Sequence, residues 1–171
     1  MNLSSNIVLI GFMGSGKSTV GRILARELDT FFIDSDTLIE AREGRDIPRI
    51  FSENGEAYFR QLECQCVEWM SRSLKGSVIS TGGGLPIHAE GLPNVGRIIF
   101  LKSDIDTLIK RIGSDETNKR PLAEQPEQIR GIYDSRLATY EKISELTVNA
   151  TRRPEEVANE ILTRLFPDRT A

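Results

Sequence analysis

The fold is decided by Asn6-Ile7-Val8-Leu9-Ile10 and the residues that follow it, Gly11-Phe12-Met13-Gly14-Ser15-Gly16-Lys17-Ser18. The first five residues form a short apolar run that predicts a buried strand. Residues 17–28 have apolar side chains at helical spacing, which predicts a helix. The glycine-rich segment between them fits the pattern GxxxxGK[ST] at every fixed position, and a strand before it and a helix after it are the context that this motif requires. The sequence therefore predicts a nucleotide-binding loop.

Each part of this loop has a physical task. Glycines let backbone N–H groups turn toward phosphate oxygens, and the helix N-terminus adds a partial positive charge. We expect Lys17 to reach the outer phosphates and the Ser18 hydroxyl to ligate Mg²⁺. A glycine-rich turn that binds no nucleotide is the alternative, and the strand-to-helix context argues against it.

Apolar runs alternate with helical periodicity along the rest of the chain. Strands are predicted at residues 6–10, 31–33, 77–80, 97–101 and 146–148, and helices at 17–28, 37–43, 48–52, 56–74, 105–112, 126–144 and 154–166. This alternation predicts βαβ units, and hence a parallel sheet covered by helices on both faces. We expect residues 1–171 to form a single domain. Residues 113–125 are polar and without periodicity, which is typical of a lid.

The composition excludes several classes of protein. Hydrophobic content of 39% and a formal charge of −3 are ordinary for a soluble globular protein, and the slightly acidic balance argues against binding to nucleic acid. No apolar run approaches the ~18 residues of a membrane span, and the first apolar run is too short for a signal peptide. The two cysteines, Cys64 and Cys66, are expected to be reduced thiols. We therefore expect a cytoplasmic protein.

Two carboxylates follow the second predicted strand. The strands at 77–80 and 97–101 do not end in an aspartate, so a carboxylate for a metal must come from elsewhere. Asp34 and Asp36 lie at the edge where open α/β sheets bind ligands. Alternate residues of an extended segment point the same way, so one carboxylate is predicted to serve the Mg²⁺ shell and the other an acceptor hydroxyl. The alternative is that Asp36 only caps a helix that begins at Thr37.

Cations and glycines point to an anionic ligand. Arg136 lies on the apolar face of the helix at 126–144 and needs an anionic partner, which is either a ligand or a structural salt bridge to Glu63 or Glu56. The glycines at 82–84 permit positive φ or close approach by a ligand, with an ordinary strand-to-helix turn as the alternative.

Four further residues are interpreted more simply. In the predicted lid, Arg120 is expected to close over the phosphates and exclude water, whereas Lys119 is either a second such cation or a solvated charge. His88 is interpreted as a surface or turn residue. Trp69 is interpreted as part of the core or of a pocket wall.

Together these motifs resemble the shikimate kinase family. The matching segments are GFMGSGKST (11–19), IDSD (33–36), GEAYFRQLE (55–63), STGGG (80–84), NKRPLAEQP (118–126), RLATY (136–140) and TRRP (151–154). The resemblance implies a three-layer α/β/α fold with a parallel sheet of five strands in the order 2-3-1-4-5, a lid at about 113–125 and a substrate-binding helical segment at about 34–62. It also implies that ATP phosphorylates the 3-hydroxyl of shikimate, on the route to chorismate and the aromatic amino acids.

The resemblance assigns a role to individual residues. The implied catalytic residues are Lys17, Asp36 and Arg120. The implied ATP-binding residues are Gly14, Ser15, Gly16, Lys17, Ser18, Thr19, Arg111, Arg120 and Arg153. The implied substrate-binding residues are Asp36, Arg60, Gly82, Gly83 and Arg136, with backbone N–H donors from the two glycines, and the implied metal ligands for Mg²⁺ are Ser18 and Asp34. Arg111 and Arg153 are implied to flank the adenine, and the register stays open between Arg152 and Arg153, and between Lys110 and Arg111.

Two other functions remain open at this point. A kinase for another small hydroxy acid, such as gluconate, also needs a carboxylate clamp, and only the ordered set of motifs argues against it. A nucleotide-binding module without catalysis predicts the loss of Lys17, Asp36 or Arg120, and all three are present. We expect a monomer that binds ATP and a small-molecule substrate, and neither nucleic acid nor a membrane.

Overall fold

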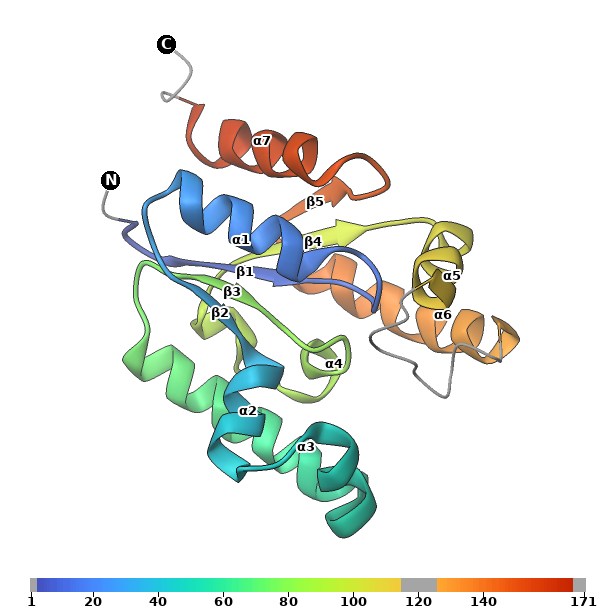
Figure 1. Cartoon of the computed structure of the whole chain (residues 1–171). Coiled ribbons are helices and arrows are strands. Elements are labelled where there is room, and N and C mark those ends of the chain that lie inside the picture. The colour runs from blue at the N-terminus through green and yellow to red at the C-terminus, as the bar shows by residue number, and fades with distance from the viewer. Residues whose placement is uncertain (1–2, 115–125, 168–171) are drawn as a thin grey trace.

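A five-stranded parallel sheet forms the centre of the protein in a computed structural model that describes residues 3–114 and 126–167 (Figure 1). The strands are β1 (Asn6–Ile10), β2 (Phe32–Asp34), β3 (Val78–Ser80), β4 (Gly96–Lys102) and β5 (Leu146–Asn149). They lie in the order β2-β3-β1-β4-β5, and every neighbouring pair is parallel. The predicted strand order is confirmed.

Two layers of helices cover the sheet. The helices are α1 (Lys17–Glu27), α2 (Ser35–Glu43), α3 (Ile47–Ser73), α4 (Leu85–His88), α5 (Ile105–Ser114), α6 (Pro126–Ile143) and α7 (Pro154–Leu165), with a short 3₁₀ helix, η1, at Leu92–Asn94. Helices α1 and α7 lie on one face, and α3 and α6 lie on the other (Figure 1). The three-layer α/β/α prediction is confirmed. Helices α4 and η1 were not predicted, because each is shorter than two helical turns and leaves no periodic pattern.

The central strand β1 contributes to both hydrophobic cores. Val8 and Ile10 join the cluster that includes residues of α3 and α6, whereas Ile7 and Leu9 join the cluster that includes residues of α1 and α7. All four side chains are fully buried. Because successive side chains of a strand point to opposite faces, a continuous apolar run is what a strand covered on both sides requires.

Local chemistry sets two helix boundaries near the site. Helix α2 begins at Ser35, not at Thr37 as predicted, because the Asp34 side chain accepts a hydrogen bond from the Asp36 N–H at 3.1 Å and caps the helix. The helices predicted at 48–52 and 56–74 join in α3, but Gly55 interrupts the helical backbone with φ 79° and ψ 174°. The predicted break is therefore present, and it turns the chain just before Glu56.

The predicted lid lies outside the described residues, except for Gly113 and Ser114 at the end of α5. Arg120 and Lys119 are among the residues that are not described. Within the ranges that are described, none of the helices combines the length and the apolar character needed to cross a membrane.

The break at Gly55 predicts opposite effects for two glycine substitutions. Its backbone conformation is one that only glycine adopts readily, so Gly55→Ala should destabilise the fold by roughly 1–3 kcal/mol. Gly131 lies inside α6, and a methyl group there would meet no atom within 4 Å. Gly131→Ala should therefore stabilise the protein by up to about 1 kcal/mol. Urea denaturation measures both values, and a Gly55→Ala variant as stable as Gly131→Ala would contradict the account.

Candidate active site

The phosphate-binding loop joins β1 to α1. Gly16 occupies the N-cap of α1 with φ 87° and supplies no side-chain cap, so the first N–H groups of the helix face the loop. Lys17 is 9% exposed, and its Nζ donates to the carbonyl oxygens of Gly11 and Phe12 at 3.0 and 2.9 Å. The loop thus holds one cation beside the positive end of a helix, as an anion site requires.

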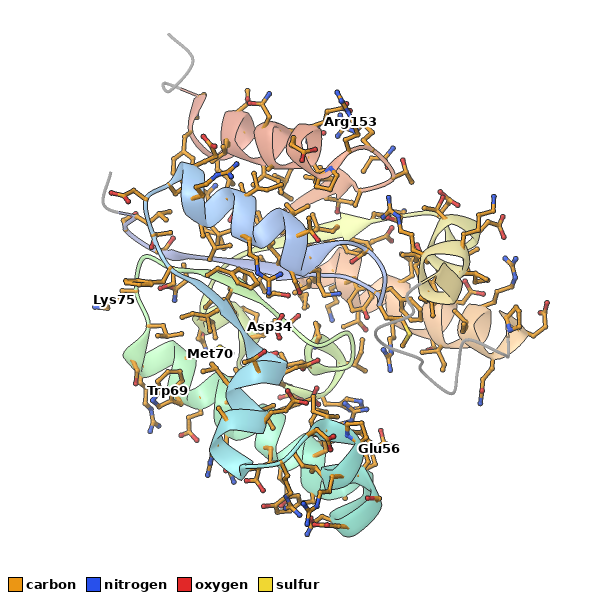
Figure 2. The ribbon with its side chains drawn as sticks, viewed as in Figure 1. Asp34, Glu56, Trp69, Met70, Lys75 and Arg153 are labelled. Carbon is orange, nitrogen blue, oxygen red and sulfur yellow. The ribbon has the colours of Figure 1, made fainter. Side chains whose placement is uncertain are left out.

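The two predicted metal ligands lie side by side. Ser18 Oγ donates to Asp34 Oδ2 at 3.1 Å, while the other oxygen of the same carboxylate caps α2. Asp34 therefore links the phosphate loop to the end of β2, where Figure 2 shows it at the junction with α2. A hydroxyl and a carboxylate are the hard oxygen ligands that Mg²⁺ prefers, so these residues fit the ion.

The structure corrects the geometry predicted for Asp36. Since α2 begins at Ser35, Asp34 and Asp36 do not share one extended segment. Asp34 is the N-cap, so the alternative in which Asp36 caps the helix is wrong. Asp36 lies in the first turn of α2, and a methyl group built on Gly82 would come within 2.5 Å of its Oδ1. The Asp36 carboxylate therefore lies against the glycine loop, residues 82–84.

Each residue of the glycine loop lies close to a different charged side chain. A methyl group on Gly82 would meet Asp36, one on Gly83 would lie 3.5 Å from Arg136 Nη1, and one on Gly84 would lie 2.6 Å from Arg60 Nη1. None of the three has a positive φ. At Gly82 and Gly84 the absence of a Cβ, and not a positive φ, leaves room for the charged side chains, whereas a methyl group on Gly83 would make only ordinary contacts. The three side chains come from α2, α6 and α3.

Backbone groups of this loop are partly engaged within the protein. The Gly82 N–H donates to Ser35 Oγ at 3.0 Å, and the Gly83 carbonyl accepts from the Tyr140 hydroxyl at 2.5 Å. Gly82 was predicted to offer its N–H to a substrate, but that N–H already has an acceptor. Among the described residues, no acceptor for the Gly83 N–H is found.

Arg60 is held by two glutamates on its own helix. Its Nη1 donates to Glu63 at 2.7 Å, and its Nη2 donates to Glu56 at 2.7 Å. The Glu63 side chain is 1% exposed, and that of Glu56 is 64% exposed. Burial raises the pKa of Glu63 although Arg60 acts in the opposite direction, whereas the hydrogen bond from Arg60 lowers the pKa of Glu56. Arg60 thus has one buried partner, Glu63, and one partner that is largely exposed to solvent, Glu56.

Arg136 does not form the structural salt bridge that was the alternative. Glu56 and Glu63 pair with Arg60, and no described carboxylate lies within ion-pair distance of Arg136. Its guanidinium instead lies 5.8 Å from the centre of the Phe12 ring, and its positive charge acts against the effect of burial on the pKa of Tyr140. The half-buried cation faces the glycine loop with no anion from the described chain.

The two arginines predicted to flank the adenine, Arg111 and Arg153, differ in their distance from the phosphate loop. Arg111 donates to the carbonyl oxygens of Gly14 and Ala150, at 3.4 and 3.0 Å, and so connects the phosphate loop to the loop after β5. Lys110 is exposed. Arg153 is the N-cap residue of α7. Its side chain is 81% exposed and pairs with Glu156, and Figure 2 shows it at the outer surface. Arg152 pairs with Glu160. The structure brings Arg111, but not Arg153, into contact with the phosphate loop.

The remaining predictions concern residues away from the loop. His88 is exposed at the end of α4, as predicted. Trp69 is 48% exposed, so it is a pocket wall and not part of the core. It lines a cavity of about 320 Å³ whose walls are Leu38, Ile39, Arg42, Leu62, Gln65, Cys66 and Trp69. Both cysteines are free thiols, and burial raises the pKa of Cys66 to about 11.

Four residues make contacts in the site that were not predicted from the sequence. They are Ser35, Glu63, Gly84 and Tyr140. Only the Arg60–Glu63 pair left a signal, because residues three apart on a helix are neighbours. The other contacts join residues that are far apart in the sequence.

The fold and the site define a class. A phosphate loop with its lysine, a serine–aspartate pair suited to Mg²⁺, and a glycine loop beside one carboxylate and two guanidinium groups are the parts of a P-loop kinase for a small anionic molecule.

The comparisons with known proteins identify the family. The sequence model of the family "Shikimate kinase" matches residues 13–166. Shikimate kinase of Helicobacter hepaticus is 39% identical over 157 residues, covering 92% of this chain and 93% of the relative. Shikimate kinase from Acinetobacter baumannii, solved in complex with shikimate, superposes with a TM-score of 0.89 at 32% identity, covering 98% of this chain and 96% of that one. Shikimate kinase from Aquifex aeolicus superposes with a TM-score of 0.83 at 39% identity, covering 95% and 97%. The chain belongs to the shikimate kinase family and is an enzyme of that family.

The close approach at the glycine loop predicts two distinct kinetic defects. Gly82→Ala should displace the Asp36 carboxylate and lower kcat at least tenfold, because displacements of ~1 Å at a reacting group cost up to about a hundredfold. Gly84→Ala should displace the Arg60 guanidinium and chiefly raise KM for the acceptor substrate. Steady-state kinetics separate the two effects, with Gly131→Ala as the control. Unchanged kinetics in both loop variants would contradict the arrangement.

Proposed function

We propose that the chain transfers the γ-phosphoryl group of ATP to the 3-hydroxyl of shikimate, giving shikimate 3-phosphate and ADP. The observation that carries this proposal is the gathering of Asp36, Arg60 and Arg136 around the glycine loop. One carboxylate and two guanidinium groups suit an acceptor that has a hydroxyl to be phosphorylated and a carboxylate to be held. The family of the chain and its similarity to a shikimate kinase solved with shikimate support the same acceptor.

Arg60 and Arg136 form the proposed clamp for the substrate carboxylate. The buried Glu63 holds Arg60 in place, because breaking a buried ion pair leaves a charge without compensation. Glu56 is mostly exposed, and an exposed ion pair contributes only about 0–1 kcal/mol. A substrate carboxylate therefore replaces Glu56 on Arg60 at small cost. Arg136 needs no such exchange.

Asp36 is the proposed acceptor of the hydroxyl proton. Its carboxylate lies beside Gly82, and a methyl group on the next residue, Gly83, would lie 3.5 Å from the Gly11 carbonyl oxygen of the phosphate loop. Lys17 is positioned to neutralise charge on the outer phosphates while the carbonyl oxygens of Gly11 and Phe12 hold its ammonium group. In this proposal the Gly83 N–H donates to the substrate, and the rate arises from alignment and charge stabilisation rather than from covalent catalysis.

Ser18 and Asp34 are the proposed ligands of Mg²⁺. Ser18 Oγ and Asp34 Oδ2 lie 3.1 Å apart at the first turn of α1, beside the phosphate loop. When bound there, Mg²⁺ neutralises charge on the β- and γ-phosphates of ATP. Asp34 also fixes α2 through its capping bond, so the same carboxylate orients the helix that carries Asp36.

The remaining roles in ATP binding also stay proposals. The loop and the first helical turn that would bind the phosphates include Gly14, Ser15, Gly16 and Thr19. Arg111 connects that loop to the segment after β5 through hydrogen bonds to Gly14 and Ala150. Arg153 as a base-flanking residue and Arg120 as a lid cation remain predictions. A cytoplasmic location and a monomeric state likewise remain predictions.

The acceptor is tested by ADP release from Mg-ATP with shikimate, quinate, gluconate or no acceptor. We expect turnover with shikimate at about 1–10³ s⁻¹, the ordinary range for enzymes. Turnover with gluconate instead would keep the P-loop chemistry and overturn the acceptor. ATP binding without any acceptor-dependent turnover would overturn the proposed reaction.

Asp36→Asn tests the proposed base. The amide keeps the shape of the side chain but cannot accept the proton, so kcat should fall at least a hundredfold while the Kd for ATP changes little. Isothermal titration calorimetry gives the Kd for ATP, and steady-state assays give kcat. A variant with the turnover of the wild type would remove Asp36 from the mechanism.

Glu56→Gln tests the exchange of partners at Arg60. Removing the exposed competitor should lower KM for shikimate roughly two- to fivefold, which corresponds to the strength of an exposed ion pair. Glu68→Gln is the matched control, since Glu68 forms a similar exposed i,i+4 pair with Arg72 on the same helix. If KM rises in the Glu56 variant, Glu56 assists binding and does not compete for Arg60.

A further inference from the structure

One buried hydroxyl holds the glycine loop beside the proposed carboxylate clamp. Tyr140 lies on α6 with its side chain fully buried, and its ring centre lies 5.2 Å from that of Phe100. Its hydroxyl donates to the Gly83 carbonyl at 2.5 Å. The Arg136 guanidinium, one turn earlier on the helix, would lie 3.5 Å from a methyl group on Gly83. The Tyr140 hydroxyl therefore fixes the residue of the glycine loop that faces Arg136.

The direction of this hydrogen bond is fixed by chemistry. A carbonyl oxygen only accepts hydrogen bonds, so the phenol gives its single proton to Gly83. Burial raises the pKa of Tyr140 to about 12, so the phenol keeps its proton at neutral pH. A donor with a charged neighbour makes a stronger hydrogen bond than an isolated hydroxyl.

A second buried hydroxyl holds the other side of the same loop. Ser35 Oγ, which is fully buried in the first turn of α2, accepts the Gly82 N–H at 3.0 Å. The Gly82 carbonyl accepts from the Leu85 N–H at 3.2 Å. The peptide groups on both sides of Gly82 and the Gly83 carbonyl are thus fixed, while the Gly83 N–H keeps no acceptor among the described residues.

We propose that Tyr140 is a positioning residue for the acceptor substrate, because its hydroxyl fixes the Gly83 peptide beside the Arg136 guanidinium. The proposal rests on the proposed role of Arg136 and Gly83 in holding that substrate. Tyr140 does not touch the substrate itself. A backbone donor that is fixed beside the carboxylate clamp keeps a constant distance from it, as recognition of a rigid ring with two polar ends requires.

The matched experiment compares Tyr140→Phe with Tyr133→Phe. Tyr133 is also a buried tyrosine of α6, but its hydroxyl donates to the Ser103 carbonyl at 2.9 Å, away from the glycine loop. Each variant loses one hydroxyl that donates to a backbone carbonyl. The quantities measured are KM for shikimate, KM for ATP, kcat and the midpoint of thermal unfolding.

We expect Tyr140→Phe to raise KM for shikimate roughly three- to tenfold, the effect of one lost hydrogen bond, and to leave KM for ATP within about twofold. Tyr133→Phe should lower the unfolding midpoint comparably without changing either KM. Equal kinetics in the two variants, or a loss of stability alone in Tyr140→Phe, overturns the proposal.

Ser35→Ala provides an independent test from the other side of the loop. It frees the Gly82 N–H, so KM for shikimate should again rise; an unchanged KM in both Ser35→Ala and Tyr140→Phe overturns the positioning role. The wild-type enzyme separates this failure from that of the proposed function. If wild type does not turn over with shikimate, the acceptor is wrong; if it does and the variants match it, only the positioning role is wrong.

Discussion

The site depends on a loop without side chains. Asp36, Arg60 and Arg136 come from three different helices, and each lies where a methyl group on residues 82–84 would press against it or touch it. Charged groups of both signs therefore meet around one backbone segment.

The sheet explains why this loop stands beside the phosphate-binding loop. Strands β1, β3 and β2 are neighbours and parallel, so the segments that follow them emerge at one edge. The phosphate loop follows β1, the glycine loop follows β3, and Asp34 ends β2. Asp34 then connects the phosphate loop to α2, since one of its oxygens contacts Ser18 and the other caps the helix that carries Asp36. The phosphate donor and its acceptor can be held at one edge because the topology makes these segments adjacent.

The sequence predicted the features that local chemistry determines. The strand order followed from the resemblance, while the strands and long helices followed from patterns of apolar residues. The phosphate loop is a contiguous motif, so its residues needed no tertiary information. The start of α2 was misplaced by two residues because a capping aspartate and an extended aspartate are the same in sequence. The burial of Glu63 and the requirement for Gly84 depend on contacts across 3 and 24 residues from Arg60, and only packing decides which face is buried.

In the proposed complex, the glycine loop holds one carboxylate and two guanidinium groups around a single acceptor. A crystal structure of the enzyme with shikimate and ADP would test this arrangement. We expect the shikimate carboxylate within hydrogen-bond distance of Arg60 and Arg136, a ring hydroxyl against Asp36, and the Gly83 N–H directed at the substrate. Shikimate bound away from residues 82–84, or with its carboxylate on neither arginine, would contradict it.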